Sequence, residues 1–131
     1  LESLVNELEV DNNVIFTGYI SSPVDYIVVI DIFLLSSFSE GTSMTLLEAM
    51  SLQKPCVVTD AGGNNEVIEH DFNGFVTKNN ELSGFAASML ELSINDEKRQ
   101  KMGHNSKARF DRIFSAENMV NAFCHYYSEN K

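Results

Sequence analysis

The sequence lacks any apolar run approaching the roughly 18 residues that a membrane-spanning helix requires. Its first ten residues, LESLVNELEV, carry acidic side chains and have neither the basic start nor the apolar block of a signal peptide. Basic residues are also few, with 9 Lys and Arg against 19 Asp and Glu and a formal net charge of −10. Because such a field repels nucleic acid and anionic membrane surfaces, we expect no nucleic-acid partner. The lack of a signal peptide and of a membrane-spanning run predicts a cytoplasmic location.

Cysteine is rare too. Cys56 and Cys124 form no CxxC pair, and no nearby His completes a set of metal ligands. We therefore expect two reduced, buried thiols and no metal site. His70, His104 and His125 show no pattern of catalytic partners and are expected to be surface or helix histidines.

The chain has 131 residues, 44% of them hydrophobic, which suffices for a single domain with its own core. It starts without Met and with a helix already in progress, so we expect a piece of a longer protein. Residues 1–79 have a mixed strand and helix pattern, whereas residues 80–131 are helical throughout.

Short apolar runs alternate with helical patterns in the first part of the chain. Strands are expected at residues 14–17, 31–35, 56–59 and 74–76, and helices at residues 3–8, 23–26, 45–52 and 65–69. The strands are continuously apolar, which is typical of a parallel sheet covered on both faces. Helical spacing continues through Phe85, Met89 and Leu92, then at 96–110 and at 116–127 with Ser115 as cap. The expected fold class is α/β, with a Rossmann-like parallel sheet, flanking helices and a helical C-terminal tail.

Residues 39–66, reading SEGTSMTLLEAMSLQKPCVVTDAGGNNE, place two glycine turns where apolar strands should end and helices should begin. Backbone N–H groups collect at such positions in parallel sheets and bind anions, so a phosphate-bearing ligand is the first hypothesis. If Ser43 caps the following helix, Glu48 lies on the loop side, clear of the core. The opposite arc then carries the apolar residues Leu46, Leu47, Ala49 and Met50.

Two carboxylates, Glu40 and Glu48, bracket the first turn and helix start. Each has a simple structural explanation: an exposed acid before a turn glycine, and an acid that complements the helix dipole. Together they provide acceptors for vicinal hydroxyls around a cluster of backbone donors that suit phosphates. A nucleotide sugar carries both kinds of group.

Residues 14–77 resemble the C-terminal, donor-binding half of the GT-B glycosyltransferases of group 1, the family known as GT4. The resemblance rests on a Glu, seven residues and a second Glu within SSFSEGTSMTLLEAMSLQKPCVVTDAGGNNE, flanked by VIFTGYI upstream and NGFV downstream. It implies a retaining hexosyltransferase that moves a sugar from a nucleotide-diphosphate sugar to a glycan or lipid acceptor. It also implies metal-independent chemistry without a cofactor, and, in the intact enzyme, a peripheral position at the inner membrane face.

The same resemblance assigns roles to individual residues. Glu40 matches the catalytic-site Glu that contacts hydroxyls of the transferred sugar, and Glu48 matches the Glu that binds the ribose. The segment that faces the sugar and diphosphate corresponds to Gly41, Thr42, Ser43 and Met44. The loop that touches the base corresponds to Tyr19 and Ile20, and the second turn of the site to Gly62, Gly63 and Glu66. For the two glycines, a tight turn that needs positive φ is an equally good explanation.

Several parts of the family pattern have no counterpart in this chain. The Arg and Lys that clamp the diphosphate, the acceptor domain and the first strands of the sheet correspond to segments upstream of residue 1. We therefore expect a partial domain that is inactive alone and whose open sheet edges re-pair or self-associate. A smaller departure is Gln53, which replaces a frequent Gly and argues against a positive φ there.

Two alternatives stay open at this point. A nucleotide-sugar epimerase built on the same two-domain plan would share the sheet and the position of the site. A non-catalytic binding or assembly module would keep the fold without the activity, and the sequence shows no identifiable general base or nucleophile that argues against it.

Overall fold

A computed structural model describes residues 1–129 of the chain. In chain order the elements are α1 (Glu2–Glu7), a 3-10 turn (Asp11–Asn13), α2 (Pro23–Ile27), β1 (Phe33–Leu35), α3 (Met44–Ser51), β2 (Cys56–Thr59), α4 (Asn64–Val67), β3 (Gly74–Thr77), α5 (Leu82–Ile94), α6 (Asp96–Arg109), a π-helical turn (Phe110–Phe114) and α7 (Ala116–Glu129). The expected α/β class is confirmed, and most expected elements are present with slightly shifted ends.

The three strands form one parallel sheet in the order β1-β2-β3. Its register aligns Phe33 with Cys56 and Cys56 with Gly74. Side chains of β2 alternate between two cores, since Cys56 and Val58 pack against α2, α3 and α4, whereas Val57 packs against α5 and α6. Cys56, Val57 and Val58 are fully buried, which explains why the run is continuously apolar.

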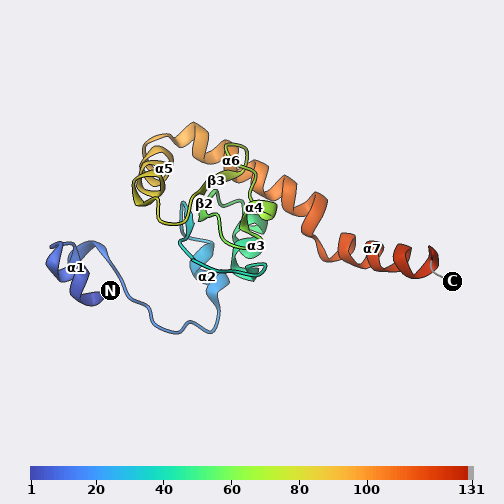
Figure 1. The fold of residues 1–131 in the computed structure, drawn as a ribbon, viewed down its shortest axis with the longest axis horizontal. Helices are drawn as coiled ribbons and strands as arrows, with labels where there is room; N and C mark the ends of the chain where they lie inside the picture. Colours follow the sequence, from blue (N-terminus) through green and yellow to red (C-terminus); the bar gives the residue numbers. More distant parts are fainter. Residues whose placement is uncertain (130–131) are drawn as a thin grey trace.

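The expected strand at residues 14–17 is not formed. This segment lies outside the sheet, in the extended stretch between α1 and α2 (Figure 1), and Ile15 is 88% exposed. Val14 has β-region backbone angles, so this residue adopts the extended conformation that its sequence favours. A strand also needs a neighbour for its N–H and C=O groups, and the described part of the chain offers none at this position.

Two further expectations are wrong. Gln53 does adopt a positive φ of 59°, because it follows the last turn of α3 in a Schellman cap, where Gln53 N–H donates to the Met50 carbonyl and Lys54 N–H to the Ala49 carbonyl. Cys124 is exposed on α7, whereas Cys56 is buried as expected and burial raises the pKa of its thiol. Of the two reduced thiols, only one belongs to the core.

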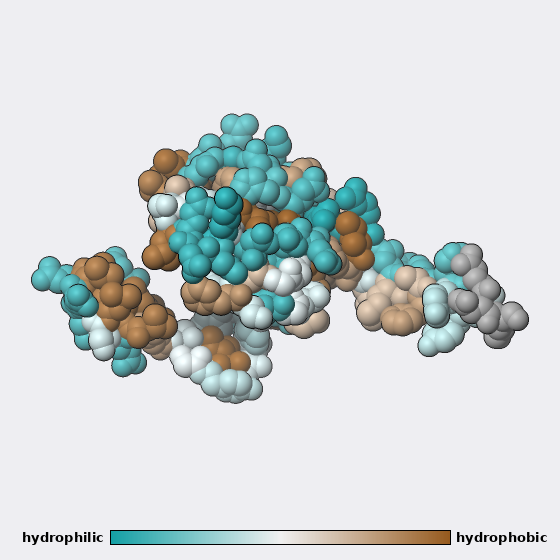
Figure 2. Space-filling view, viewed as in Figure 1, coloured by the Kyte–Doolittle hydropathy of each residue, from teal (hydrophilic) through white to brown (hydrophobic). Residues whose placement is uncertain are grey.

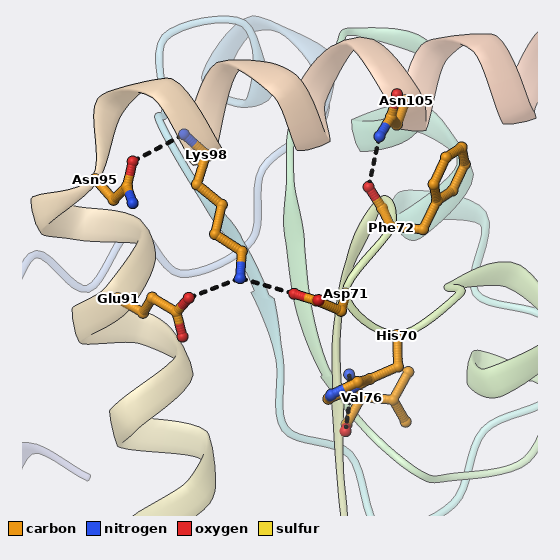
Figure 3. Close-up of polar contacts among 8 residues, drawn as sticks. All are labelled: His70, Asp71, Phe72, Val76, Glu91, Asn95, Lys98 and Asn105. Atoms are coloured by element: carbon orange, nitrogen blue, oxygen red, sulfur yellow. Dashed lines mark hydrogen bonds and ion pairs between the residues drawn. The ribbon is translucent and has the colours of Figure 1, made fainter.

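Lys98 forms ion pairs that join α5 and α6 to the turn that precedes β3 (Figure 3). Lys98 Nζ on α6 lies 2.7 Å from Asp71 Oδ1 and 2.7 Å from Glu91 Oε1 on α5. The same Nζ lies 4.8 Å from the centre of the Phe75 ring. The hydrogen bond from Lys98 lowers the pKa of Asp71, and the same carboxylate together with Glu91 raises the pKa of Lys98. This network lies at the amino end of β3, opposite the carboxyl ends of the strands.

α6 also approaches the main chain between α3 and β2. A Cβ at Gly103 would overlap the carbonyl oxygen of Gln53, so only glycine lets α6 come this close to the main chain at Gln53. Arg109, the last residue of α6, reaches α4, where its Nε donates to the Val67 carbonyl at 2.9 Å and its Nη2 to the Glu66 carbonyl at 2.9 Å. The helical part therefore braces both α3 and α4.

α1 and α7 extend from opposite ends of this body (Figure 1). Both carry exposed apolar or aromatic side chains, among them Leu4 at 50%, Phe123 at 58% and Tyr127 at 66% exposure. Figure 2 shows brown or tan surface on both helices. None of the helices within residues 1–129 combines the length and apolarity needed to cross a membrane.

Candidate active site

The loops that follow the three strands meet at one edge of the sheet, because parallel strands end on the same side. The first loop runs from residue 36 to the start of α3 and contains Glu40. The second, residues 60–63, leads into α4, and the third, residues 78–81, leads into α5. The candidate residues of both glycine turns lie here.

Glu40 is half-buried and held by its own loop. Ser37 Oγ donates to Glu40 Oε1 at 2.6 Å, and the Ser37 carbonyl accepts from Thr59 Oγ1 at 2.5 Å. The carboxylate is thus connected through Ser37 to the end of β2. Sequence reasoning missed Ser37 and Thr59, although a hydroxyl three residues before the Glu was a readable signal.

The start of α3 has the expected cap. Ser43 is buried, and its Oγ accepts from Leu46 N–H at 3.4 Å and lies 3.1 Å from Thr45 Oγ1. Gly41, Thr42 and Met44 are exposed around this helix start. Their backbone N–H groups therefore lie where an anion would approach α3.

Glu48 follows one turn further along α3. Leu46, Ala49 and Met50 are fully buried and Leu47 packs against the same core, as the helical wheel predicts. Glu48 lies off this arc but is half-buried rather than clear of the protein, and its Oε2 atom is buried with no hydrogen-bond partner among the described residues. A buried carboxylate oxygen without a donor is costly, so this atom is suited to accept a hydrogen bond from a ligand.

The second glycine turn supports the first. Gly62 has a φ of 53°, and a Cβ on it would overlap the Glu40 carbonyl, while Gly63 N–H donates to the Gly41 carbonyl at 3.2 Å. The positive-φ explanation is therefore confirmed for Gly62 alone, since Gly63 has a φ of −81° and serves as the N-cap of α4. The Glu66 side chain is exposed, and its main chain, rather than its carboxylate, is engaged by Arg109.

Tyr19 and Ile20 lie outside the three loops that form this edge. They belong to the extended segment between α1 and α2 (Figure 1), and Tyr19 is 94% exposed. The expected position of a base-contacting loop depends on the neighbouring strand that residues 14–17 do not form here.

The carboxylates of the site have no compensating cation in the described residues. Neither Glu40 nor Glu48 forms an ion pair with Lys or Arg within residues 1–129. No group of three or more His, Cys, Asp or Glu side chains in this range is arranged to hold a metal ion. Backbone donors and the helix dipole are the positive features that α3 itself provides.

Comparison with known proteins finds a matching family for the chain. The model of the glycosyl transferases group 1 matches residues 1–109. N-acetyl-alpha-D-glucosaminyl L-malate synthase from Bacillus anthracis is 29% identical over 92% of this chain and 32% of its own length. O-antigen chain mannosyltransferase C from Escherichia coli is 30% identical over 89% of this chain and 33% of its own length.

Solved structures share the fold. HepE from Anabaena, determined in complex with UDP, superposes with a TM-score of 0.91 over 98% of this chain and 35% of its own, at 24% identity. The C-terminal domain of a group 1 glycosyl transferase, LpcC from Francisella tularensis, superposes with a TM-score of 0.81 over 88% of this chain and 60% of its own, at 25% identity. The chain spans about a third of the length of the curated relatives it matches. On the match of the family model to residues 1–109, the chain belongs to the glycosyl transferases group 1 family.

Proposed function

We propose that this chain is the donor-binding part of a retaining glycosyltransferase that transfers a sugar from a nucleotide-diphosphate sugar to a glycan or lipid acceptor. The observation that carries the proposal is the buried Glu48 Oε2 one turn into α3, which has no hydrogen-bond partner among the described residues and follows the exposed residues Gly41, Thr42 and Met44 at the helix start. This arrangement offers an acceptor for a ribose hydroxyl next to donors for a diphosphate. HepE, which shares the fold, has been determined with UDP and with UDP-glucose.

The roles follow the two glycine turns. Glu48 binds the ribose, Gly41 to Met44 face the diphosphate and sugar, and Glu40 contacts sugar hydroxyls with the carboxylate that Ser37 orients. Gly62 and Gly63 are support residues, because they fix the main chain of the Glu40 turn. Tyr19 and Ile20 reach the base only when the segment before α2 joins a longer sheet.

Catalysis in the intact enzyme rests on positioning and electrostatics. As the bond to the anomeric carbon breaks, negative charge grows on the leaving diphosphate, and backbone donors at α3 with a basic pair from the preceding segment stabilise it. This chain supplies the backbone donors and Glu40, and the acceptor domain supplies the opposite wall. The 131 residues alone are therefore inactive but retain weak donor binding. The intact enzyme works in the cytoplasm, at the periphery of the inner membrane face.

Nucleotide binding by the 131-residue chain tests the proposal. Glu48→Gln keeps the size of the side chain and removes its charge, and we expect it to weaken UDP or GDP binding about tenfold, as for loss of a charged hydrogen bond. Chemical-shift titration by NMR measures the affinity. Glu97→Gln, an exposed acid in the first turn of α6, is the matched control and should bind like the wild type.

If Glu48→Gln and the wild type bind every nucleoside diphosphate with equal affinity, the proposed contact between Glu48 and the ribose is refuted. Activity of the full-length protein separates the remaining alternatives. Substitution of Glu40 by Gln there should reduce turnover sharply with little change in nucleotide affinity. An active Glu40→Gln enzyme would refute the assigned role, and absence of sugar transfer with intact donor binding would favour the non-catalytic module.

A further inference from the structure

Glu40 is held separately at its main chain and at its side chain. Its carbonyl lies so close to Gly62 that a Cβ there would overlap it, which fixes the main chain of the turn. This contact leaves the side-chain torsions of Glu40 free to rotate between staggered positions. The direction of the carboxylate therefore depends on other contacts, and these start at Thr59, the last residue of β2.

Thr59 binds the loop after β1 through its hydroxyl group. Thr59 Oγ1 donates to the Ser37 carbonyl at 2.5 Å and lies 3.4 Å from the Leu35 carbonyl. Thr59 is itself held by the segment that leads into α4. Its carbonyl accepts from Ala61 N–H at 2.8 Å and from Nδ2 of the buried Asn64 at 3.1 Å. The main chain at Ser37 is thus attached to a well-anchored strand end.

Ser37 joins this main chain to the carboxylate of Glu40. Its Oγ donates to Glu40 Oε1 at 2.6 Å, a length typical of a hydroxyl that donates to a charged oxygen. Ser37 is the donor that the described residues provide to this half-buried carboxylate. Because Oε1 is engaged, Oε2 is the oxygen that remains for a ligand.

Hydrogen bonds, rather than close packing, determine these side-chain positions. Ser37 and Thr59 both border a cavity of about 380 Å³, and Phe38, which follows Ser37, is 77% exposed. A side chain that packing does not confine keeps several rotamers unless a hydrogen bond selects one. Loss of the Thr59 hydroxyl should therefore release the Glu40 carboxylate without opening the core.

We propose that Thr59 is a positioning residue, which acts through Ser37 to order the Glu40 side chain before the donor binds and directs Oε2 toward the sugar hydroxyls. Ordering a free Glu side chain costs conformational entropy, and a side chain that is already ordered avoids this cost during binding and reaction. The link to the sugar rests on the proposed function, because it takes Glu40 as the residue that contacts sugar hydroxyls. The ordering itself is a property of the ligand-free chain.

The rotamer of Glu40 in the ligand-free 131-residue chain tests the ordering. Vicinal NMR couplings across its Cα–Cβ and Cβ–Cγ bonds should indicate one rotamer in the wild type and an average of rotamers in Thr59→Val and Ser37→Ala. Thr59→Ser keeps the hydroxyl and should retain the single rotamer. Thr77→Val is the matched control, because Thr77 pairs with Thr59 in the sheet and its Oγ1 donates to the Val58 carbonyl at 3.4 Å.

Sugar transfer by the full-length protein tests the consequence for the reaction. Thr59→Val should lower kcat about tenfold, as for the cost of ordering one long side chain, and leave UDP or GDP affinity unchanged. Thr59→Ser should restore kcat, and Thr77→Val should match the wild type. A general loss of stability would lower nucleotide affinity as well, so the split between kcat and affinity identifies positioning.

Several results would overturn the positioning role: averaged Glu40 couplings in the wild type, the same couplings in wild type and Thr59→Val, or equal kcat losses in Thr59→Val and Thr77→Val. If Thr59→Val does not fold, Ser37→Ala decides, with the exposed Ser39→Ala as its control. A single Glu40 rotamer that depends on Thr59, in a chain that binds neither UDP nor GDP, supports the ordering and refutes the proposed donor site.

Discussion

At the scale of single residues, the Glu40 turn depends on Gly62, which has a φ of 53° and whose missing Cβ leaves room for the Glu40 carbonyl. Gly62→Ala adds backbone strain and a steric overlap, and we expect a loss of about 2–4 kcal/mol in the free energy of unfolding. Urea denaturation followed by circular dichroism measures it. Nucleotide affinity should fall in the same variant, because the Glu40 turn is displaced.

Gly18 provides the matched control for Gly62. Its φ of 63° is similar, but a Cβ there would meet no atom within 4 Å. Gly18→Ala adds only strain, in a segment outside the core, and should cost about 1 kcal/mol or less. Equal effects of the two substitutions would contradict the close approach of the two turns.

At the scale of elements, the contacts between helices determine the stability of the fold. α6 packs on the chain between α3 and β2 through Gly103, where a Cβ would overlap the Gln53 carbonyl. Gly103→Ala should therefore destabilise the protein by about 1–3 kcal/mol. Gly84 on α5 is the control, because its Cβ would touch only the flexible Glu81 side chain, and Gly84→Ala should stabilise α5 by about 0.5–1 kcal/mol. Thermal or urea unfolding that gives both variants the same sign would refute this packing.

The Lys98 network predicts how the α5–α6 corner responds to pH. The lowered pKa of Asp71 gives stability that is present above its ordinary value of 3.8 and lost as pH falls through the folded value. The raised pKa of Lys98 gives stability that is present below 10.5 and lost at higher pH. The contribution should thus be constant across neutral pH and disappear in acid.

Lys98→Met is the variant that tests this pH dependence. The difference in unfolding free energy between wild type and Lys98→Met should be level near pH 7 and shrink below pH 3.8, and salt should reduce it. Lys101→Met on the same helix is the control, because Lys101 acts on Asp71 only through a weaker, more distant attraction. If the two variants show the same acid dependence, the ion pair is not its source.

Features encoded by neighbouring residues could be predicted from the sequence, whereas contacts between distant segments could not. The helices, the buried strands, the Ser43 cap and the glycine turns were predictable, because each is encoded by neighbouring residues. The missing strand at residues 14–17 was not predictable, because a strand needs a partner from elsewhere in the sheet. The positive φ of Gln53 follows from its place after α3 rather than from its residue type. The contact between Gly62 and Glu40 joins loops from different strands, which spacing alone does not show.

At the scale of the whole molecule, the sheet ends at β1, which pairs only with β2 among the strands of the described residues. Residues 14–17 do not pair with this edge. Leu34 on β1 is 41% exposed and lines an apolar cavity of about 350 Å³ with Ile32, Ala86, Met89, Leu90 and Ser93. An apolar surface next to unpaired backbone groups favours addition of another strand.

We therefore expect the 131-residue chain to self-associate through β1. Light scattering should show a mass that rises with concentration, and added salt should strengthen association by screening the net charge of −10. Leu34→Lys places a charge at the edge and should restore the monomer, because pairing would bury the ammonium group. Val29→Lys is the control, since Val29 is 76% exposed and precedes the strand. A monomer at every concentration, or equal dissociation by both variants, would place the source of association elsewhere, and the exposed apolar face of α7 would be the next surface to substitute.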